Sequence, residues 1–254
     1  MIIWITGAST GIGRATAKKF AARGDTVIVS ARGVDALNSL AEKCSGLKGQ
    51  IIPKPCDTTD EEAVNQAVAE AEDEAGPIDL AILNAGVYLP VRHAPFDRDA
   101  YRKTIDINLQ GTVNCLAPLI DRMVPRKSGR IYMVSSVAGY SGLPTSAAYG
   151  ASKAAMINLA ESLKFDLDNH GVSIGVINPG FVRTPATDQN EFPMPFLMEV
   201  EDAADRIVQG VDRGGFEITF PRRFTYQLKV LRLLPHWLYF SFVSRSTGWK
   251  DKTD

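Results

Sequence analysis

The sequence contains few cysteines, and none is placed as a disulfide or metal protein would place it. Its 254 residues include three, Cys44, Cys56 and Cys115, without a CxxC pair or metal-site spacing. We therefore expect reduced thiols in the core of a cytoplasmic protein. The three histidines are also scattered without spaced partners, so we expect no metal site and no catalytic triad.

The chain also lacks long apolar runs and a large excess of either charge. No apolar run reaches the ~18 residues that a membrane span needs, and the first apolar segment begins at Ile2, so we expect no signal peptide. The net charge of −1 gives no support for nucleic-acid binding. With 45% hydrophobic and 22% charged residues, the composition is that of an ordinary globular protein with a sizeable core.

Short apolar segments alternate with longer stretches of helical pattern. The segments are rich in Val and Ile and mostly lack in-and-out alternation, which is typical of strands buried on both faces. They cover residues 2–6, 26–31, 50–56, 79–84, 130–135, 172–178 and 216–220. The helical stretches cover residues 13–23, 34–44, 60–75, 97–123, 149–169 and 201–211. This alternation predicts one doubly wound α/β domain over residues 1–254, with a seven-stranded parallel sheet and helices on both faces.

Two regions interrupt the alternation. Residues 183–199 contain prolines and no clear period, so we expect a loop that acts as a substrate lid. The C-terminal extension, residues 222–254, includes an apolar tail at 226–243 with scattered basic residues. The tail could be a helix docked on a partner subunit, which we favour, an interfacial membrane helix, or a cover for the active site. Pro235 predicts a break between two short helices.

A glycine-rich loop, Thr6-Gly7-Ala8-Ser9-Thr10-Gly11-Ile12-Gly13, follows the first predicted strand. Glycines let the backbone turn sharply and approach a pyrophosphate, to which a helix N-terminus presents free N–H groups. The GxxxGxG spacing differs from the GxGxxG fingerprint, and such a loop alone could be a tight strand-to-helix turn. Its position between a buried strand and a helix favours a dinucleotide site.

Tyr149 and Lys153 lie one helical turn apart in the run Tyr149-Gly150-Ala151-Ser152-Lys153. A phenol has a reference pKa of about 10, and an ammonium group one turn away is expected to lower it. In isolation such a pair is usually a surface contact. Together with a dinucleotide loop, it predicts a proton donor for hydride transfer to or from a carbonyl.

These motifs together resemble the short-chain dehydrogenase/reductase family in its compact single-domain form. The resemblance extends to about Phe220 and implies a Rossmann-type fold. The motifs occur in the expected order: the glycine loop, Asp57, Asn84-Ala85-Gly86, Asn108, Ser136, Tyr149 with Lys153, and Asn178-Pro179-Gly180 with Thr184. The family's activity implies an oxidoreductase that interconverts a carbonyl and an alcohol.

The resemblance implies four catalytic residues. Tyr149 would protonate the carbonyl oxygen in reduction, or accept the proton in oxidation. Lys153 would lower the Tyr149 pKa and bind the nicotinamide ribose, Ser136 would hold the substrate oxygen, and Asn108 would anchor a water of a proton relay. Without a catalytic role, Tyr149 and Lys153 would form a surface contact, Ser136 would be a turn residue and Asn108 a solvated asparagine.

The resemblance also implies a set of cofactor-binding residues. Asp57 would contact the adenine, unless it serves only the turn before the next helix, and Thr184 would lie near the nicotinamide carboxamide. The set is Gly7, Ser9, Thr10, Gly11, Ile12, Gly13, Arg32, Asp57, Asn84, Ala85, Gly86, Tyr149, Lys153, Pro179, Gly180, Val182 and Thr184.

The second predicted strand carries the signal for cofactor preference in Val29-Ser30-Ala31-Arg32. An acidic residue at its end would bind an adenosine ribose and select NAD(H), but Ala31 stands there. The neighbouring Arg32 suits the 2′-phosphate of NADP(H), which we predict over NAD(H). A solvated surface arginine is the alternative for Arg32. Arg14 could be a second phosphate contact or, equally, a solvated arginine in the first helical turn.

Substrate and partners are less strongly indicated. The lid carries apolar side chains that favour a lipophilic carbonyl or alcohol, although they could equally pack the lid onto the body. The lid residues are Phe192, Met194, Pro195, Phe196, Leu197 and Met198. The family implies a homodimer or homotetramer built through the helices around Asn108 and Tyr149. We expect a cytoplasmic protein, with peripheral membrane association through the tail as the second choice.

Two other functions are alternatives to the dehydrogenase interpretation. A non-catalytic NADP(H)-binding regulator on the same fold would be favoured by loss of the tyrosine or the lysine, yet both are present. A sugar-nucleotide epimerase usually needs a longer C-terminal substrate domain than the stretch that follows Phe220.

Overall fold

A parallel sheet of seven strands forms the centre of the protein, in the order β3-β2-β1-β4-β5-β6-β7. The computed structural model describes residues 1–92, 94–187 and 194–249. The strands are β1 (Ile2–Thr6), β2 (Thr26–Ser30), β3 (Gln50–Pro53), β4 (Leu80–Leu83), β5 (Gly129–Val134), β6 (Val172–Pro179) and β7 (Glu217–Phe220). The strand order reverses between β1 and β4, which confirms the predicted doubly wound sheet.

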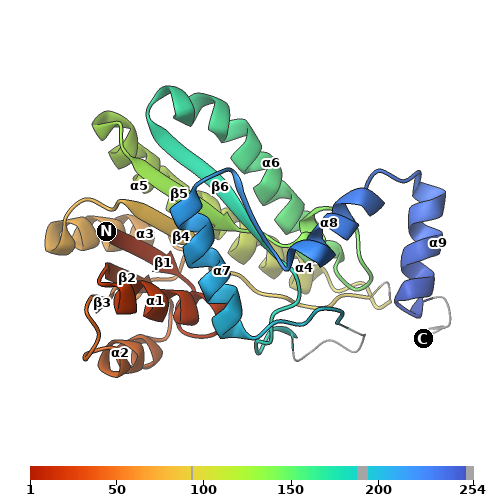
Figure 1. The fold of residues 1–254 in the computed structure, drawn as a ribbon, viewed down its shortest axis with the longest axis horizontal. Coiled ribbons are helices and arrows are strands. Elements are labelled where there is room, and N and C mark those ends of the chain that lie inside the picture. The colour runs from red at the N-terminus through yellow and green to blue at the C-terminus, as the bar shows by residue number, and fades with distance from the viewer. Residues whose placement is uncertain (93, 188–193, 250–254) are drawn as a thin grey trace.

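Helices cover both faces of the sheet (Figure 1). One face packs against α1 (Gly11–Arg23), α2 (Val34–Lys43) and α7 (Val200–Arg213). The other packs against α3 (Glu61–Ala75), α5 (Gly111–Arg126) and α6 (Ala147–Asn169). Each face therefore has its own apolar core.

Strand β1 shows why the strands lack a polar face. Ile3 and Ile5 pack in the core with α1, whereas Trp4 between them packs in the opposite core. Because successive side chains point to opposite faces, a strand covered by helices on both sides must be apolar throughout. The Trp4 indole meets its one polar requirement by donating to Ser30 Oγ at 2.9 Å.

The helical stretch predicted over residues 97–123 is divided into three parts in the structure. It consists of α4 (Arg98–Ile105), a π-helical turn, η1 (Asp106–Gln110), and α5. A π turn holds one more residue than an α turn and is frequent at functional sites. Here it carries Asn108, so the departure from regular helix falls on a predicted catalytic position.

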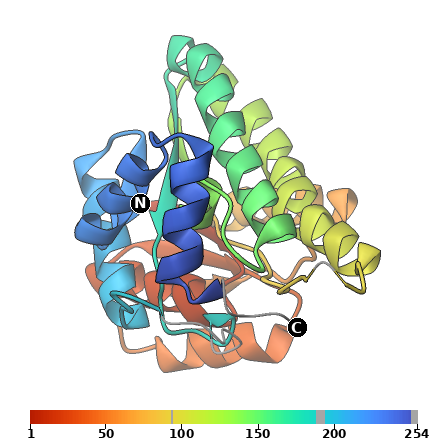
Figure 2. The ribbon, with the colours of Figure 1, turned by 90° about the vertical axis from the view of Figure 1, so that its right-hand side faces the viewer.

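The C-terminal tail forms two helices, α8 (Arg222–Leu231) and α9 (His236–Ser246). Pro235 precedes α9, which confirms the predicted break. In Figure 1, α9 stands at the end of the molecule away from the sheet, and Figure 2 shows it nearest the viewer. Its attachment to the body includes a hydrogen bond from the Tyr239 hydroxyl to Gly142 O at 2.7 Å. Within the described ranges, no helix has the length and apolar character to cross a bilayer.

Candidate active site

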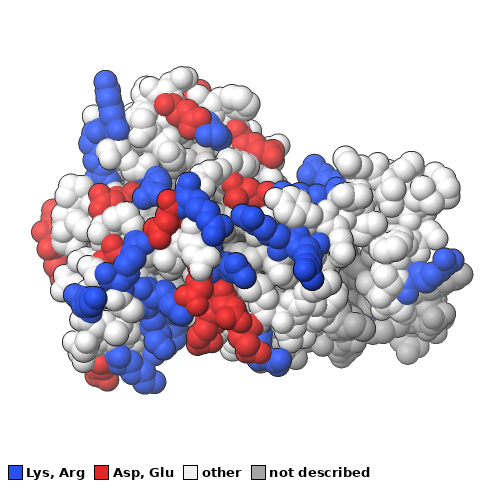
Figure 3. All heavy atoms as spheres, viewed as in Figure 1, with Lys and Arg blue, Asp and Glu red and all other residues white. Residues whose placement is uncertain are grey.

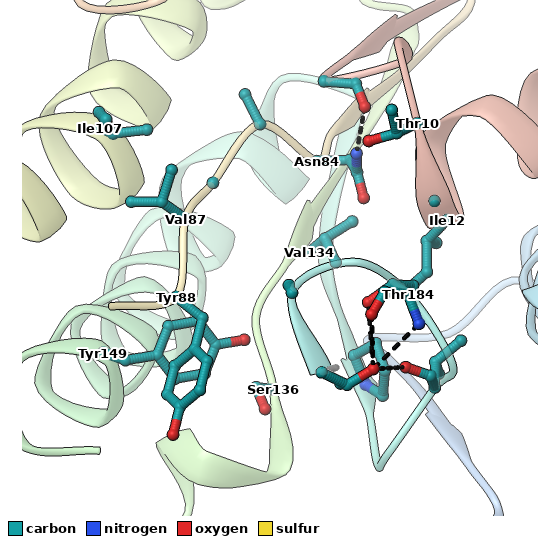
Figure 4. Close-up of a pocket in the computed structure, with 18 of the residues that line it drawn as sticks. Thr10, Ile12, Asn84, Val87, Tyr88, Ile107, Val134, Ser136, Tyr149 and Thr184 are labelled. Carbon is teal, nitrogen blue, oxygen red and sulfur yellow. Dashed lines mark hydrogen bonds between the residues drawn. The ribbon is translucent and has the colours of Figure 1, made fainter. Parts of the chain in front are cut away.

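A cleft of about 490 Å³ opens where β1, β4, β5 and β6 end. This is the edge at which the strand order reverses, the usual ligand position in doubly wound sheets. Figure 4 shows Thr10, Ile12, Asn84 and Thr184 on one side of the cleft, with Tyr149, Tyr88 and Ser136 on the other. One side therefore belongs to the glycine loop and the other to the predicted proton donor.

The structure brings nearly all the predicted site residues to this cleft. The lining includes Gly7, Ser9, Thr10, Gly11, Ile12, Arg32, Asp57, Asn84, Ala85, Gly86, Ser136, Tyr149, Lys153, Pro179, Gly180, Val182 and Thr184. Two predicted residues, Gly13 and Asn108, do not line it. Both act behind its wall, as described next.

Packing within the protein determines the shape of the glycine loop. A Cβ atom on Gly7 would lie 2.8 Å from Ala85 Cα, and one on Gly13 would lie 2.6 Å from Gly7 O. The Asn84 amide fills this space and donates to Gly7 O and Thr6 O, each at 3.1 Å. Gly13 is therefore required by the packing of the loop itself, and its contact with a cofactor stays a prediction.

The first turn of α1 gives the cleft its anion-binding character. Gly7 and Gly11 have φ of 65° and 55°, which a side chain would strain. Thr10 is the N-cap of α1 but makes no side-chain capping bond, so the N–H groups of the first turn remain available. The positive end of the helix dipole and these donors fit the pyrophosphate of a dinucleotide.

Helix α6 places Tyr149 and Lys153 one turn apart, as the spacing predicts. The Lys153 side chain is buried, and its Nζ donates to Val134 O at 2.7 Å. Nζ lies 5.5 Å from the centre of the Tyr149 ring. Burial lowers the pKa of Lys153 to about 8.

The pKa of Tyr149 moves in the direction opposite to the expected one. Burial raises it to about 12, and the nearby Ser136 hydroxyl, which favours the phenolate, does not offset that cost. The Lys153 ammonium is directed to a backbone carbonyl instead. Tyr149 is therefore a protonated phenol at neutral pH.

Ser136 lies at the end of β5 and begins a short 3-10 turn, η2 (Val137–Gly139). Its Oγ accepts from Ala138 N at 3.1 Å, and its hydroxyl proton lies on the cleft side, within hydrogen-bonding reach of the Tyr149 phenol. The adjacent Ser135 hydroxyl already donates to Lys153 O at 2.8 Å and holds α6 against β5. The two serines thus have separate tasks.

Asn108 is fully buried and holds the chain that follows β4. Its Oδ1 accepts from Val87 N at 2.7 Å, and its Nδ2 donates to Val87 O at 3.0 Å and to Ser152 Oγ at 3.1 Å. A Cβ on Gly86 would lie 3.2 Å from this Oδ1 and 3.5 Å from Lys153 Nζ. Asn108 therefore positions the wall beside Lys153; its expected role in a water relay stays a prediction.

Comparison with known proteins agrees with this arrangement. The profile described as short chain dehydrogenase matches residues 1–193. The chain belongs to this family. It is 37% identical to an uncharacterized oxidoreductase of Myxococcus xanthus, over 92% of this chain and 93% of that one. It is 35% identical to the 3-oxoacyl-[acyl-carrier-protein] reductase FabG of Thermotoga maritima, over 73% and 75%.

Solved structures share the fold of this short-chain dehydrogenase. A 3-oxoacyl-[acyl-carrier protein] reductase from Brucella melitensis superposes with a TM-score of 0.74 at 27% identity, covering 86% of this chain and 89% of that one. An actinorhodin polyketide ketoreductase, solved with NADPH, gives a TM-score of 0.77 at 22% identity, covering 86% and 95%. This short-chain dehydrogenase is thus an oxidoreductase of Rossmann-like architecture.

The two arginines predicted near the cofactor lie in different surroundings in this short-chain dehydrogenase. The Arg32 side chain is 68% exposed and lies at the cleft, with Nη1 4.0 Å from Asp57 Oδ2. Arg14 instead donates to Ala36 O at 2.8 Å and joins α1 to α2. Arg14 does not line the cleft, and its guanidinium also donates to Ser9 O at 3.4 Å, so its contact with a phosphate stays a prediction.

Asp57 also performs the local role left open for it. Its Oδ1 accepts from Thr59 N at 3.0 Å and from the Thr59 hydroxyl at 2.8 Å, as in an Asx turn. Its other oxygen faces Arg32. One carboxylate therefore shapes the turn before α3 and lines the cleft.

Among its described residues, the predicted lid lines the cleft with Thr184, Pro185, Ala186 and Thr187. Its two ends are paired, because Arg183 N donates to Met198 O and Met198 N donates to Phe181 O, both at 2.9 Å. Phe196 and Met198 line a second cavity of about 520 Å³ and not the cleft. Phe192 of the lid and His93 lie outside the described residues. Apolar lining in the cleft comes instead from Tyr88, Val137, Leu143 and Phe181.

Glu217 at the start of β7 joins several elements and was not anticipated from the sequence. Its Oε1 accepts from the Tyr140 hydroxyl at 2.5 Å and from Asn178 Nδ2 at 2.7 Å, while Oε2 pairs with Lys229 of α8. Burial opposes ionisation, but these donors together hold the pKa of Glu217 below its usual value. No local motif marks such a residue, because its partners come from β6, η2 and α8.

Proposed function

We propose that this protein is an NADP(H)-dependent reductase that interconverts a lipophilic carbonyl compound and its alcohol. The observation that carries the proposal is the convergence of a protonated, partly buried Tyr149, the Ser136 hydroxyl beside it and Lys153 on one cleft with the glycine loop. A general acid and a dinucleotide cradle at one site are what carbonyl reduction requires.

The glycine loop and the first turn of α1 would hold the cofactor's phosphates, and Lys153 and Thr184 would face its nicotinamide end. When bound, the cofactor supplies or accepts the hydride. Ser136 would orient the substrate oxygen by donating its hydroxyl proton, and Tyr149 would give that oxygen its phenolic proton. A phenol with a pKa of about 12 is protonated at neutral pH and can therefore act as the general acid in reduction.

Arg32 supports NADP(H) over NAD(H). Its exposed guanidinium at the cleft can make charge-assisted, bidentate hydrogen bonds to a phosphate. The position before it, Ala31, offers no carboxylate to a ribose. The Asp57 carboxylate lies 4.0 Å from this guanidinium, and an ion pair between two groups so exposed is weak.

A lipophilic substrate is supported by the apolar side chains beside Tyr149. A relative named a 3-oxoacyl-[acyl-carrier-protein] reductase makes 3-oxoacyl thioesters one class to examine. The test is a screen of aliphatic, aromatic and steroid-like ketones and 3-oxoacyl thioesters, followed by NADPH absorbance. Substrate-dependent oxidation of NADPH is expected; a preference for NADH across the panel would contradict the cofactor assignment, and no turnover on any class would contradict the activity.

We also propose a homodimer or homotetramer built through α5 and α6. Phe165 on α6 is 79% exposed, and a large aromatic so placed fits a subunit contact. Light scattering on Phe165→Asp should show a lower mass than the parent; an unchanged mass would contradict this contact. The three buried, unpaired cysteines fit a cytoplasmic location.

A further inference from the structure

The C-terminal helices expose an unusual amount of apolar surface. Of the fourteen large apolar side chains exposed among the described residues, seven belong to residues 226–242. The most exposed are Leu233 at 82%, Trp237 at 71%, Val230 at 63% and Phe240 at 61%. These residues crowd onto one end of the molecule, and contiguous apolar surface of this kind marks an interaction site.

The same segment carries charge of only one sign. Residues 221–249 contain no Asp or Glu. They contain five cationic residues: Arg222, Arg223, Lys229, Arg232 and Arg245. Lys229 is paired with Glu217. An apolar, aromatic surface flanked by cations is the composition of helices that lie on anionic membranes.

A second cavity next to the tail adds to the positive charge. Its walls include Arg206 and Arg213 of α7 with Arg222 and Arg223 of α8. Within the part of the chain that the structure describes, none of these four guanidinium groups has an ion pair or side-chain hydrogen bond. Figure 3 shows basic groups over α7 and α8 on the same face as the mainly white lobe formed by α8 and α9, with an acidic patch over the far end of α7, away from that lobe. The charge and the apolar surface can therefore meet one plane together.

A second copy of the chain fits this surface less well than a membrane. In a two-fold dimer built on residues 221–249, which contain no Asp or Glu, the same patch faces itself, so the arginines of α8 would approach like charges. An anionic bilayer offers phosphates to the arginines and an acyl boundary to Trp237 and Phe240. We infer that the face formed by α7, α8 and α9 docks this protein on the surface of a membrane rich in anionic phospholipid.

The experiment is co-sedimentation of the full chain with phosphatidylcholine vesicles and with phosphatidylcholine–phosphatidylglycerol vesicles. Binding is expected to the mixed vesicles and not to the neutral ones. Arg223→Glu should weaken it roughly thirtyfold, because each basic group near such a surface contributes about 1 kcal/mol and the reversal changes two charges. Leu233→Ser should weaken it roughly tenfold through lost apolar burial.

Matched controls come from the turn after α2, at the opposite end of the molecule in Figure 1. Leu47→Ser and Lys48→Glu make the same chemical changes at exposed positions and should bind vesicles like the parent. Absence of binding, equal binding to neutral vesicles, or equal losses in the controls would overturn the inference. So would Leu233→Ser or Arg223→Glu lowering the mass seen by light scattering without altering vesicle binding, since the face would then be a subunit contact.

Discussion

The glycine loop at residues 7–13 and the helices α8 and α9 differ in where their polar and apolar groups find contacts. The loop is held by contacts within the protein, since Asn84 donates to its carbonyls and its glycines pack against neighbouring backbone. The C-terminal helices leave aromatic side chains in solvent and arginines unpaired among the described residues. The polar and packing requirements of the loop are thus met within the protein, whereas those of the C-terminal face are not, which is why we propose a membrane as its partner.

The largest effect is expected at the cleft, from Tyr149→Phe, which removes the phenolic oxygen of the proposed general acid. We expect kcat for reduction to fall about 10³-fold, the usual scale for loss of a general acid. NADPH affinity should be almost unchanged, because the loop is held by other residues. Steady-state kinetics and cofactor titration measure both quantities. Tyr101→Phe on α4 is the matched control and should keep full turnover; substantial turnover by Tyr149→Phe would refute the role.

Lys153→Met tests whether a buried ammonium is retained for function at the expense of stability. Turnover should fall about 10²-fold or more. In the parent, the folded-state pKa of Lys153, about 8, is below its unfolded value of 10.5, so the unfolded chain holds more protons between these values. Parent stability attributable to this group should therefore rise by about 3 kcal/mol as the pH increases from 8 to 10.5.

The measurement is urea denaturation of both proteins across that pH window. The rise due to Lys153 should be missing from the variant. Parallel stability curves for parent and variant would show that the ammonium is not penalised by burial.

Arg32→Ala tests cofactor preference at the solvent-exposed rim of the cleft. NADPH should bind about 10- to 100-fold more weakly through loss of charge-assisted hydrogen bonds, while NADH affinity should hardly change. Isothermal titration with each cofactor gives the ratio. Equal weakening of both would mean that Arg32 supports the cleft without reading the 2′-phosphate.

Glu217→Gln tests the junction between the two regions and has the smallest expected effect. The amide keeps the shape but removes the charge opposite Lys229, so the unfolding free energy should fall by ~2 kcal/mol. For a chain of this size that is a decrease of roughly 4–8 °C in Tm. Glu201→Gln, exposed on α7, is the control and should leave Tm unchanged. A neutral result at Glu217 would mean that α8 is held by apolar packing alone.

The sequence was sufficient to predict a residue's role where that role depends on residues close to it along the chain. Buried strands, the glycine loop and the Tyr149–Lys153 spacing are local patterns, and the fold and family follow from them. The cleft position of Ser136 could be predicted because parallel strands end at one edge.

Other features depend on contacts between distant segments. Gly13 is required by Asn84 and Gly7, Asn108 lies on a π turn that no periodicity marks, and Arg14 is captured by α2. Burial also reversed the direction expected for the Tyr149 pKa, because the distance of Lys153 from the phenol depends on where Val134 O lies. The spacing of two residues in the sequence predicts that they are neighbours on a helix, but it does not predict how deeply their side chains are buried.

The Glu217 carboxylate connects the cleft with the C-terminal helices and could couple ligand binding at the two places. One of its oxygens holds Asn178, in the strand end that borders the cleft, and the other holds Lys229 on the helix of the exposed face. If a ligand in the cleft shifts Asn178, the resulting change in affinity at the α8 surface must be matched by an equal change in ligand affinity when that surface is engaged. A single acidic side chain would then make occupancy of the cleft and occupancy of the surface report on each other.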